Sequence, residues 1–124
     1  MSAAKHTPGP WVFVSQADWP HTQIVHVTAQ NWGVVANLRI DPAMPHLADR
    51  QRANLRLIAA APELLEALQS ARAVIQADRD SLAGCHTNPH TKQLDAAGAA
   101  GCDEYDVVLA QIDAAIAKAT GEQA

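Results

Sequence analysis

Large aromatic side chains are scarce in this sequence, since its 124 residues include three tryptophans, one tyrosine and one phenylalanine. The hydrophobic share of 48% is reached largely with alanine, of which there are 26. A core of alanine, leucine, valine and isoleucine suits close contact between helices but leaves little bulk to fill a large interior. We therefore expect one modest core in a single domain over residues 1–124, completed by contact with further copies of the chain.

Long hydrophobic runs are also absent. No apolar stretch approaches the roughly 20 residues that a transmembrane helix needs, and the first ten residues, MSAAKHTPGP, lack the hydrophobic centre of a secretion signal. These absences predict a cytoplasmic protein with no membrane partner. In that compartment the two cysteines are expected to stay reduced.

An excess of basic residues is missing as well. Nine lysines and arginines stand against 13 aspartates and glutamates, which gives a net charge of −4 and a pI near 5.8. A nucleic-acid-binding surface normally carries a positive field. Nucleic acid is therefore not an expected partner.

Catalytic patterns are the last absence. No serine or cysteine stands in a recognisable arrangement with a histidine and an acid, as nucleophilic catalysis requires. Gly98 and Gly101 lack the lysine and the preceding strand of a phosphate-binding loop. We predict neither an enzyme nor a bound cofactor.

Two cysteines and two histidines come near to a metal-site pattern, namely Cys85, His86, His90 and Cys102. Zinc needs four ligands that converge as a tetrahedron, usually held in close pairs, and this spacing provides no such pair. The prediction is no metal site. If Cys85 ends one helix and Cys102 begins its antiparallel partner, the two thiols lie at one end of a hairpin, where they remain thiols or join as a disulfide.

The first 40 residues have the alternation of strands. Trp11–Val14, Ile24–Thr28 and Val34–Ile40 are short runs of β-branched and aromatic residues separated by turn-forming residues. The third run predicts one face made of Val34, Ala36, Leu38 and Ile40. A small antiparallel β-meander over residues 11–40 follows.

The rest of the chain is helical in pattern, over residues 47–82 and 103–119. Pro62 cannot continue a helix but suits the first turn of a new one, so a short helix and a long helix meet near Ala61. We expect Asp103 to cap the last helix and residues 84–101 to form a long loop. The fold class is α+β: the meander, a short helix and a long antiparallel helical hairpin.

The helical patterns also predict which faces pack. Asn54, Leu57, Ile58 and Ala61 share one arc of the short helix, with Arg52 and Arg56 opposite. The two predicted seams of the hairpin are Leu64, Leu68, Ala71, Ile75 and Leu82 against Tyr105, Leu109, Ile112, Ile116 and Ala119. Leu68 is expected to meet Ile112.

One group of residues has the chemistry of a nucleotide site. Trp11 and Trp32 offer faces on which a base can stack, and Arg39 and Arg56 offer forks that pair with phosphate. Asn54, a polar residue on an apolar arc, either ties the helix to nearby backbone or contacts a ligand. The alternative is that the tryptophans fill the core and the arginines are solvated.

Two motifs carry a family resemblance. HTPGPW at residues 6–11 and ANLRLIAAAPELLEAL at residues 53–68 resemble segments of small phage and prophage proteins, as does AAIAKATGE at residues 114–122. The order of a small antiparallel sheet followed by helices also resembles a phage anti-defence sponge, which binds the cyclic ADP-ribose signal of Thoeris immunity.

The resemblance implies a non-enzymatic phage protein that sequesters a nucleotide-derived immune signal in the host cytoplasm during infection. It also implies a homo-oligomer, a dimer or higher. The alternative is a protein-binding module that inhibits a host defence complex by docking through its helical hairpin.

Overall fold

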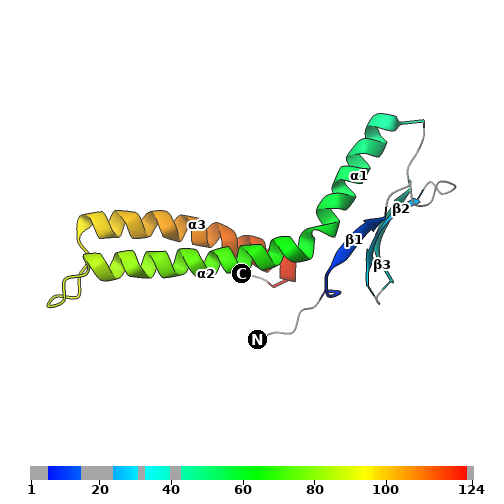
Figure 1. Ribbon diagram of the computed structural model, residues 1–124. Coiled ribbons are helices and arrows are strands. Elements are labelled where there is room, and N and C mark those ends of the chain that lie inside the picture. The colour runs from blue at the N-terminus through cyan, green and yellow to red at the C-terminus, as the bar shows by residue number, and fades with distance from the viewer. Residues whose placement is uncertain (1–5, 15–23, 31–32, 40–42, 123–124) are drawn as a thin grey trace. The chain divides into compact units, whose positions relative to one another are not determined.

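The structure is a computed structural model that describes residues 6–14, 24–30, 33–39 and 43–122. In these residues three strands precede three helices (Figure 1), which confirms the α+β class. The chain forms two compact units, Met1–Leu64 and Leu65–Ala124. That both belong to one domain stays a prediction.

The sheet is an antiparallel meander in the order β1-β2-β3. Its strands are β1 (Trp11–Val14), β2 (Ile24–Ala29) and β3 (Gly33–Arg39). The predicted pairing of the second and third strands is confirmed, with Val25 opposite Leu38 and Val27 opposite Ala36. Alternate residues of β2 point inward, so Val25 and Val27 are fully buried.

The face predicted for the third strand is wrong at its first residue. The register between β2 and β3 shifts between Val27 and Thr28, which pair with Ala36 and Val34. Val35 is therefore the extra residue of a β-bulge, and it packs against the core while Val34 is 54% exposed. A period of two cannot reveal a bulge, because the inserted residue reverses the alternation.

Helix α1 (Pro45–Ala59) covers the inner face of the sheet. It begins two residues earlier than predicted, with proline in its first turn, where the missing N–H has no helical partner to lose. Its Leu55 is fully buried and Ala48 nearly so, and both join Val25 and Val27 in the core. The core of this unit is therefore a helix on a sheet.

The predicted inner arc of this helix is correct at Ile58 but wrong at Asn54 and Leu57. Asn54 is exposed and Leu57 is 64% exposed, whereas Leu55 and Ile58 contact the core. A run rich in alanine and leucine is apolar on several sides, so periodicity alone did not identify the side that the sheet covers.

Helix α2 (Ala61–His86) begins one residue after the C-cap of α1 at Ala60. The predicted junction near Ala61, with Pro62 in the first turn, is confirmed. The helix continues past the predicted end near residue 82, through Gly84 to His86.

Helix α3 (Ala96–Thr120) starts well before the predicted residue 103. Its N-cap is Asp95, whose carboxylate accepts a hydrogen bond of 2.7 Å from the Gly98 backbone N–H, so Asp103 is not the cap. The predicted long loop over residues 84–101 is wrong: both of its ends are helical, and the connection is residues 87–95.

The glycines that suggested a loop are instead sites of close helix approach. A Cβ on Gly98 would overlap the Cβ of His86, and one on Gly101 would lie 2.6 Å from Leu82 Cδ2. Glycine is tolerated inside α3 at these points because any larger residue would push the helices apart. Composition alone does not separate this use of glycine from a flexible loop.

Two ion pairs fix how α2 and α3 lie side by side and antiparallel (Figure 1). Arg72 donates to Asp113 and Arg79 donates to Asp106 through two nitrogens each. Each step forward along α2 is a step back along α3, so Leu68 is level with Ala117. The expected Leu68–Ile112 contact is thus displaced by about one turn.

The seam of this hairpin repeats at alternating spacings of three and four residues. Its buried and partly buried positions are Leu65, Leu68, Arg72, Ile75, Arg79 and Leu82 on α2 and Gly98, Cys102, Tyr105, Leu109, Ile112 and Ile116 on α3. Leu64, Ala71 and Ala119, which were predicted to belong to it, are exposed. Arginines hold seam positions because they reach acids on the facing helix.

Both cysteines are free. Cys85 is exposed, and Cys102 is buried inside α3 rather than at its start. The geometry assumed for a disulfide therefore rested on a misplaced helix start.

Candidate functional site

A shallow hollow of about 330 Å³ lies between the sheet and the helices of the first unit. Its lining comes from β1, from α1 and from the start of α2: Trp11, Phe13, Arg56, Ala59, Ala60 and Glu63. Two of the five predicted ligand-binding residues, Trp11 and Arg56, are thus brought together. The hollow has an aromatic wall, an alanine floor and two opposite charges.

The aromatic wall follows from the alternation of β1. Trp11 and Phe13 are two residues apart, so both point to the side that α1 covers. The indole of Trp11 donates its N–H to the Thr7 carbonyl at 3.1 Å, and the His6 ring meets it edge-on at 6.2 Å between centroids. Its donor is thereby occupied, which leaves the ring face as its means of contact.

The two motifs that carry the phage resemblance meet at this place. A Cβ on Gly9 would lie 2.8 Å from Pro62 Cβ, so glycine is required where the HTPGPW segment passes the start of α2. Trp11 belongs to the same segment, and Arg56 belongs to the second motif. The two motifs therefore supply every lining residue of the hollow except Phe13.

Arg56 supplies the positive charge of the hollow. Its guanidinium carbon lies 5.3 Å from the centroid of the Phe13 ring, within cation–π distance. A guanidinium over a ring keeps its N–H donors at the edge of its plane, where they can form a fork to an oxyanion. The side chain, predicted to face away from the apolar arc, instead lies over the edge of the sheet.

Glu63 supplies the negative charge, from the first turn of α2, where an acid interacts favourably with the helix dipole. The hollow is therefore close to neutral in sum but charged at two separate points. Such a lining can bind a planar group with an anionic side and a hydroxylated or amine-bearing side.

The other predicted site residues do not join the hollow. Arg39 is opposite Ile24 at one end of β2, while Trp11 is opposite Ala29 at the other end, on the far edge strand. Asn54 is exposed on α1 outside the lining. Trp32 lies outside the described residues.

Phe13 and Glu63 line the hollow but were not among the predicted ligand-binding residues. Phe13 stands two residues after Trp11 in a predicted strand, and that spacing indicates an aromatic pair on one face. Glu63 carries no such signal, because nothing in its local sequence shows that it lies near β1.

A second, polar hollow of about 420 Å³ lies in the connection between α2 and α3. His86 Nδ1 lies 2.9 Å from Asp95 Oδ2. The Gly98 backbone N–H and then His86 hold the pKa of the Asp95 carboxyl below its ordinary value. These contacts close the hairpin and cap α3. They give His86 and Asp95 a structural role that requires no ligand.

The described residues include no cluster of three or more histidine, cysteine, aspartate or glutamate side chains that could hold a metal ion. Nor is any described helix both long and apolar enough to cross a membrane.

The chain matches one known protein family over nearly its whole length. A family model described as Salmonella phage P22 protein Y8K6 matches residues 1–123. The chain belongs to this phage protein family. The prediction of a small phage protein is thereby confirmed. No curated protein and no solved structure matches the chain.

Proposed function

We propose that this phage protein is a non-enzymatic binding protein that sequesters a nucleotide-derived immune signal of the host. The observation that supports the proposal best is the hollow in which one guanidinium stands beside two aromatic rings. It acts in the host cytoplasm during infection, where such a signal is made.

The ligand class follows from the lining. A purine face can stack on Trp11 or Phe13, and the diphosphate of a cyclic ADP-ribose isomer can take the donors of Arg56. Glu63 can accept hydrogen bonds from ribose hydroxyls, as acidic residues do in dinucleotide sites. Sequestration needs no chemical step, so the bound signal is released unchanged.

Calorimetric titration with cyclic ADP-ribose isomers tests the proposal. A charge-assisted hydrogen bond contributes about 1.5–3 kcal/mol, so Arg56→Ala is expected to weaken binding about ten- to a hundredfold. Arg39→Ala is the matched control, because Arg39 is also an exposed arginine of the first unit but does not line the hollow. It is expected to leave affinity unchanged.

A second measurement addresses the state of the ligand. The protein is purified from cells whose signalling immune system has been activated and is then heated, and the released small molecules are analysed by mass spectrometry. An intact cyclic nucleotide supports sequestration. Wild-type protein that binds neither cyclic ADP-ribose isomers nor cyclic oligonucleotides, in either measurement, overturns it.

A protein-docking function is the second candidate, because the hairpin carries exposed apolar residues. Val107 is 60% exposed on α3, and an exposed valine on a helix surface is a common contact for a partner protein. Val107→Glu would then abolish protection of the phage on a defended host, whereas Arg56→Ala would not. The reverse result supports sequestration.

A further inference from the structure

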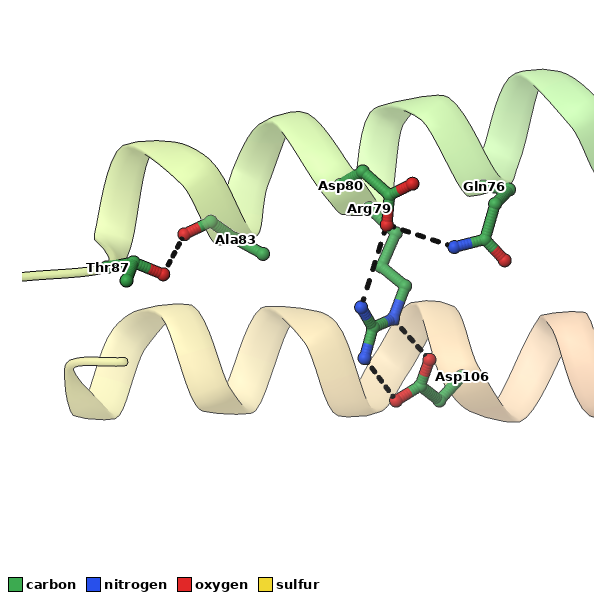
Figure 2. Close-up of polar contacts among 6 residues, drawn as sticks. All are labelled: Gln76, Arg79, Asp80, Ala83, Thr87 and Asp106. Carbon is green, nitrogen blue, oxygen red and sulfur yellow. Dashed lines mark hydrogen bonds and ion pairs between the residues drawn. The ribbon is translucent and has the colours of Figure 1, made fainter. Parts of the chain in front are cut away.

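The two flanks of the hairpin seam in the second unit differ in chemistry. One flank carries the ion pairs: Figure 2 shows Arg79 reaching Asp106 across the helices, with Gln76 and Asp80 beside it. Asp106 and Asp113 follow seam residues of α3 by one position, so both pairs lie on this flank.

The opposite flank, here called the valine flank, is exposed and combines alanine and valine with polar and charged residues. On α2 its stripe is Ala67, Ala71, Val74 and Asp78, and on α3 it is Glu104, Val108, Gln111, Ala115 and Lys118. Each stripe repeats at three and four residues beside its seam, which places it along one side of the helix. Val74 is 62% exposed and Val108 is 42% exposed.

The charges at the two ends of this flank are opposite and evenly placed. The ion pair places Arg72 of α2 at the same height along the hairpin as Asp113 of α3. Counting along the two antiparallel helices from this pair, Lys118 lies at the height of Ala67, and Glu104 lies at the height of Ser81. Val74 of α2 lies midway between these two heights, seven residues from Ala67 and seven from Ser81. At 1.5 Å per residue, Lys118 and Glu104 lie about 21 Å apart along α3, too far to pair within one chain.

We propose that the valine flank binds a second copy of the chain, so that two hairpins form an antiparallel four-helix bundle about a two-fold axis at Val74. A two-fold contact uses the same patch on both subunits. The rotation places each helix on the same helix of the other copy, so Lys118 of each copy lies beside Glu104 of the other, and Val108 lies beside Ala115. Small residues at the centre allow close helix packing.

Sedimentation equilibrium of the full chain tests the contact. The wild type is expected at twice its 13.2 kDa monomer mass in the micromolar range. Val74→Glu would place two carboxylates together on the axis and raise the dimer dissociation constant at least about tenfold. Ala73→Glu is the matched control, since Ala73 is exposed but lies off the flank; it is expected to remain dimeric.

A charge exchange separates this contact from a loss of folding. Glu104→Lys and Lys118→Glu are each expected to weaken the dimer, and the two changes in one chain are expected to restore it. Circular dichroism checks that every variant keeps the helicity of the wild type. A monomeric wild type overturns the proposal, as does a double variant that dissociates as far as either single variant.

Discussion

Glycines inside helices differ sharply in what surrounds them. Gly98 faces the backbone end of the His86 side chain, whereas a Cβ on Gly84 would meet no atom within 4 Å apart from its chain neighbours and the backbone of its own helix. Gly98→Ala is expected to destabilise the protein by about 1–3 kcal/mol through overpacking. Gly84→Ala is expected to stabilise it by about 0.5–1 kcal/mol through helix propensity. Urea unfolding measures both, and equal effects of the two changes would contradict the packing of α3 on α2.

Neighbouring leucines of α1 have different roles. Leu55 is fully buried against the sheet, while Leu57 is 64% exposed. Leu55→Ala is expected to cost about 2–5 kcal/mol of the free energy of unfolding, including the cavity it leaves. Leu57→Ala, which deletes the same atoms, is expected to cost no more than about 0.5 kcal/mol. Thermal melts of both variants check this, and a larger loss for Leu57 would restore the inner arc predicted from the sequence.

At the scale of elements, the stability of the hairpin formed by α2 and α3 is expected to depend on pH. Ion pairing with Arg79 and Arg72 lowers the pKa of Asp106 and Asp113 from the ordinary value of 3.8, and the Gly98 N–H lowers that of Asp95. The folded state therefore binds fewer protons than the unfolded state, so these carboxylates contribute stability above about pH 4. That stability is lost as pH falls through the lowered pKa values.

The expected result is a fall in the melting temperature of α2 and α3 between pH 4 and pH 2, followed by circular dichroism. The double variant Asp106→Asn, Asp113→Asn is expected to show a smaller fall, because its two amides do not titrate. Because the pairs are exposed, salt is expected to reduce the difference. An identical fall in the variant would show that other groups dominate acid unfolding.

At the scale of the whole molecule, charge is divided between the two units. Residues 1–64 hold five lysines and arginines and four acids, for a net +1, while residues 65–124 hold four and nine, for a net −5. The two add to the −4 of the chain. The anion-binding function is thus proposed for the less acidic unit, where the field opposes an anionic ligand least.

We also predict that the two units of the molecule unfold together in one transition. Helix α2 runs without interruption across the boundary between Leu64 and Leu65, which favours one cooperative transition. All three tryptophans lie in the first unit. Gly98→Ala in the second unit is therefore expected to lower the melting temperature reported by tryptophan fluorescence. A shift seen only by circular dichroism would indicate two independent domains.

Much of the architecture was determined by local sequence. The three strands, the start of a new helix at the proline and the antiparallel pairing of β2 with β3 follow from alternation, turn residues and the missing proline N–H. These features depend on residues close in the chain, so a single sequence specifies them. Trp11 and Arg56 were also identified as ligand-binding candidates from side-chain chemistry alone.

Tertiary structure decided what depends on partners far apart in the chain. Gly98 belongs to a helix because His86 lies against it, and Leu55 rather than Leu57 is buried because the sheet covers that side of α1. Gly9 lets one motif pass close to Pro62 in the other, and residues of both motifs line the hollow. Local patterns carry no information about such contacts, since the free energy that selects them comes from packing between distant segments.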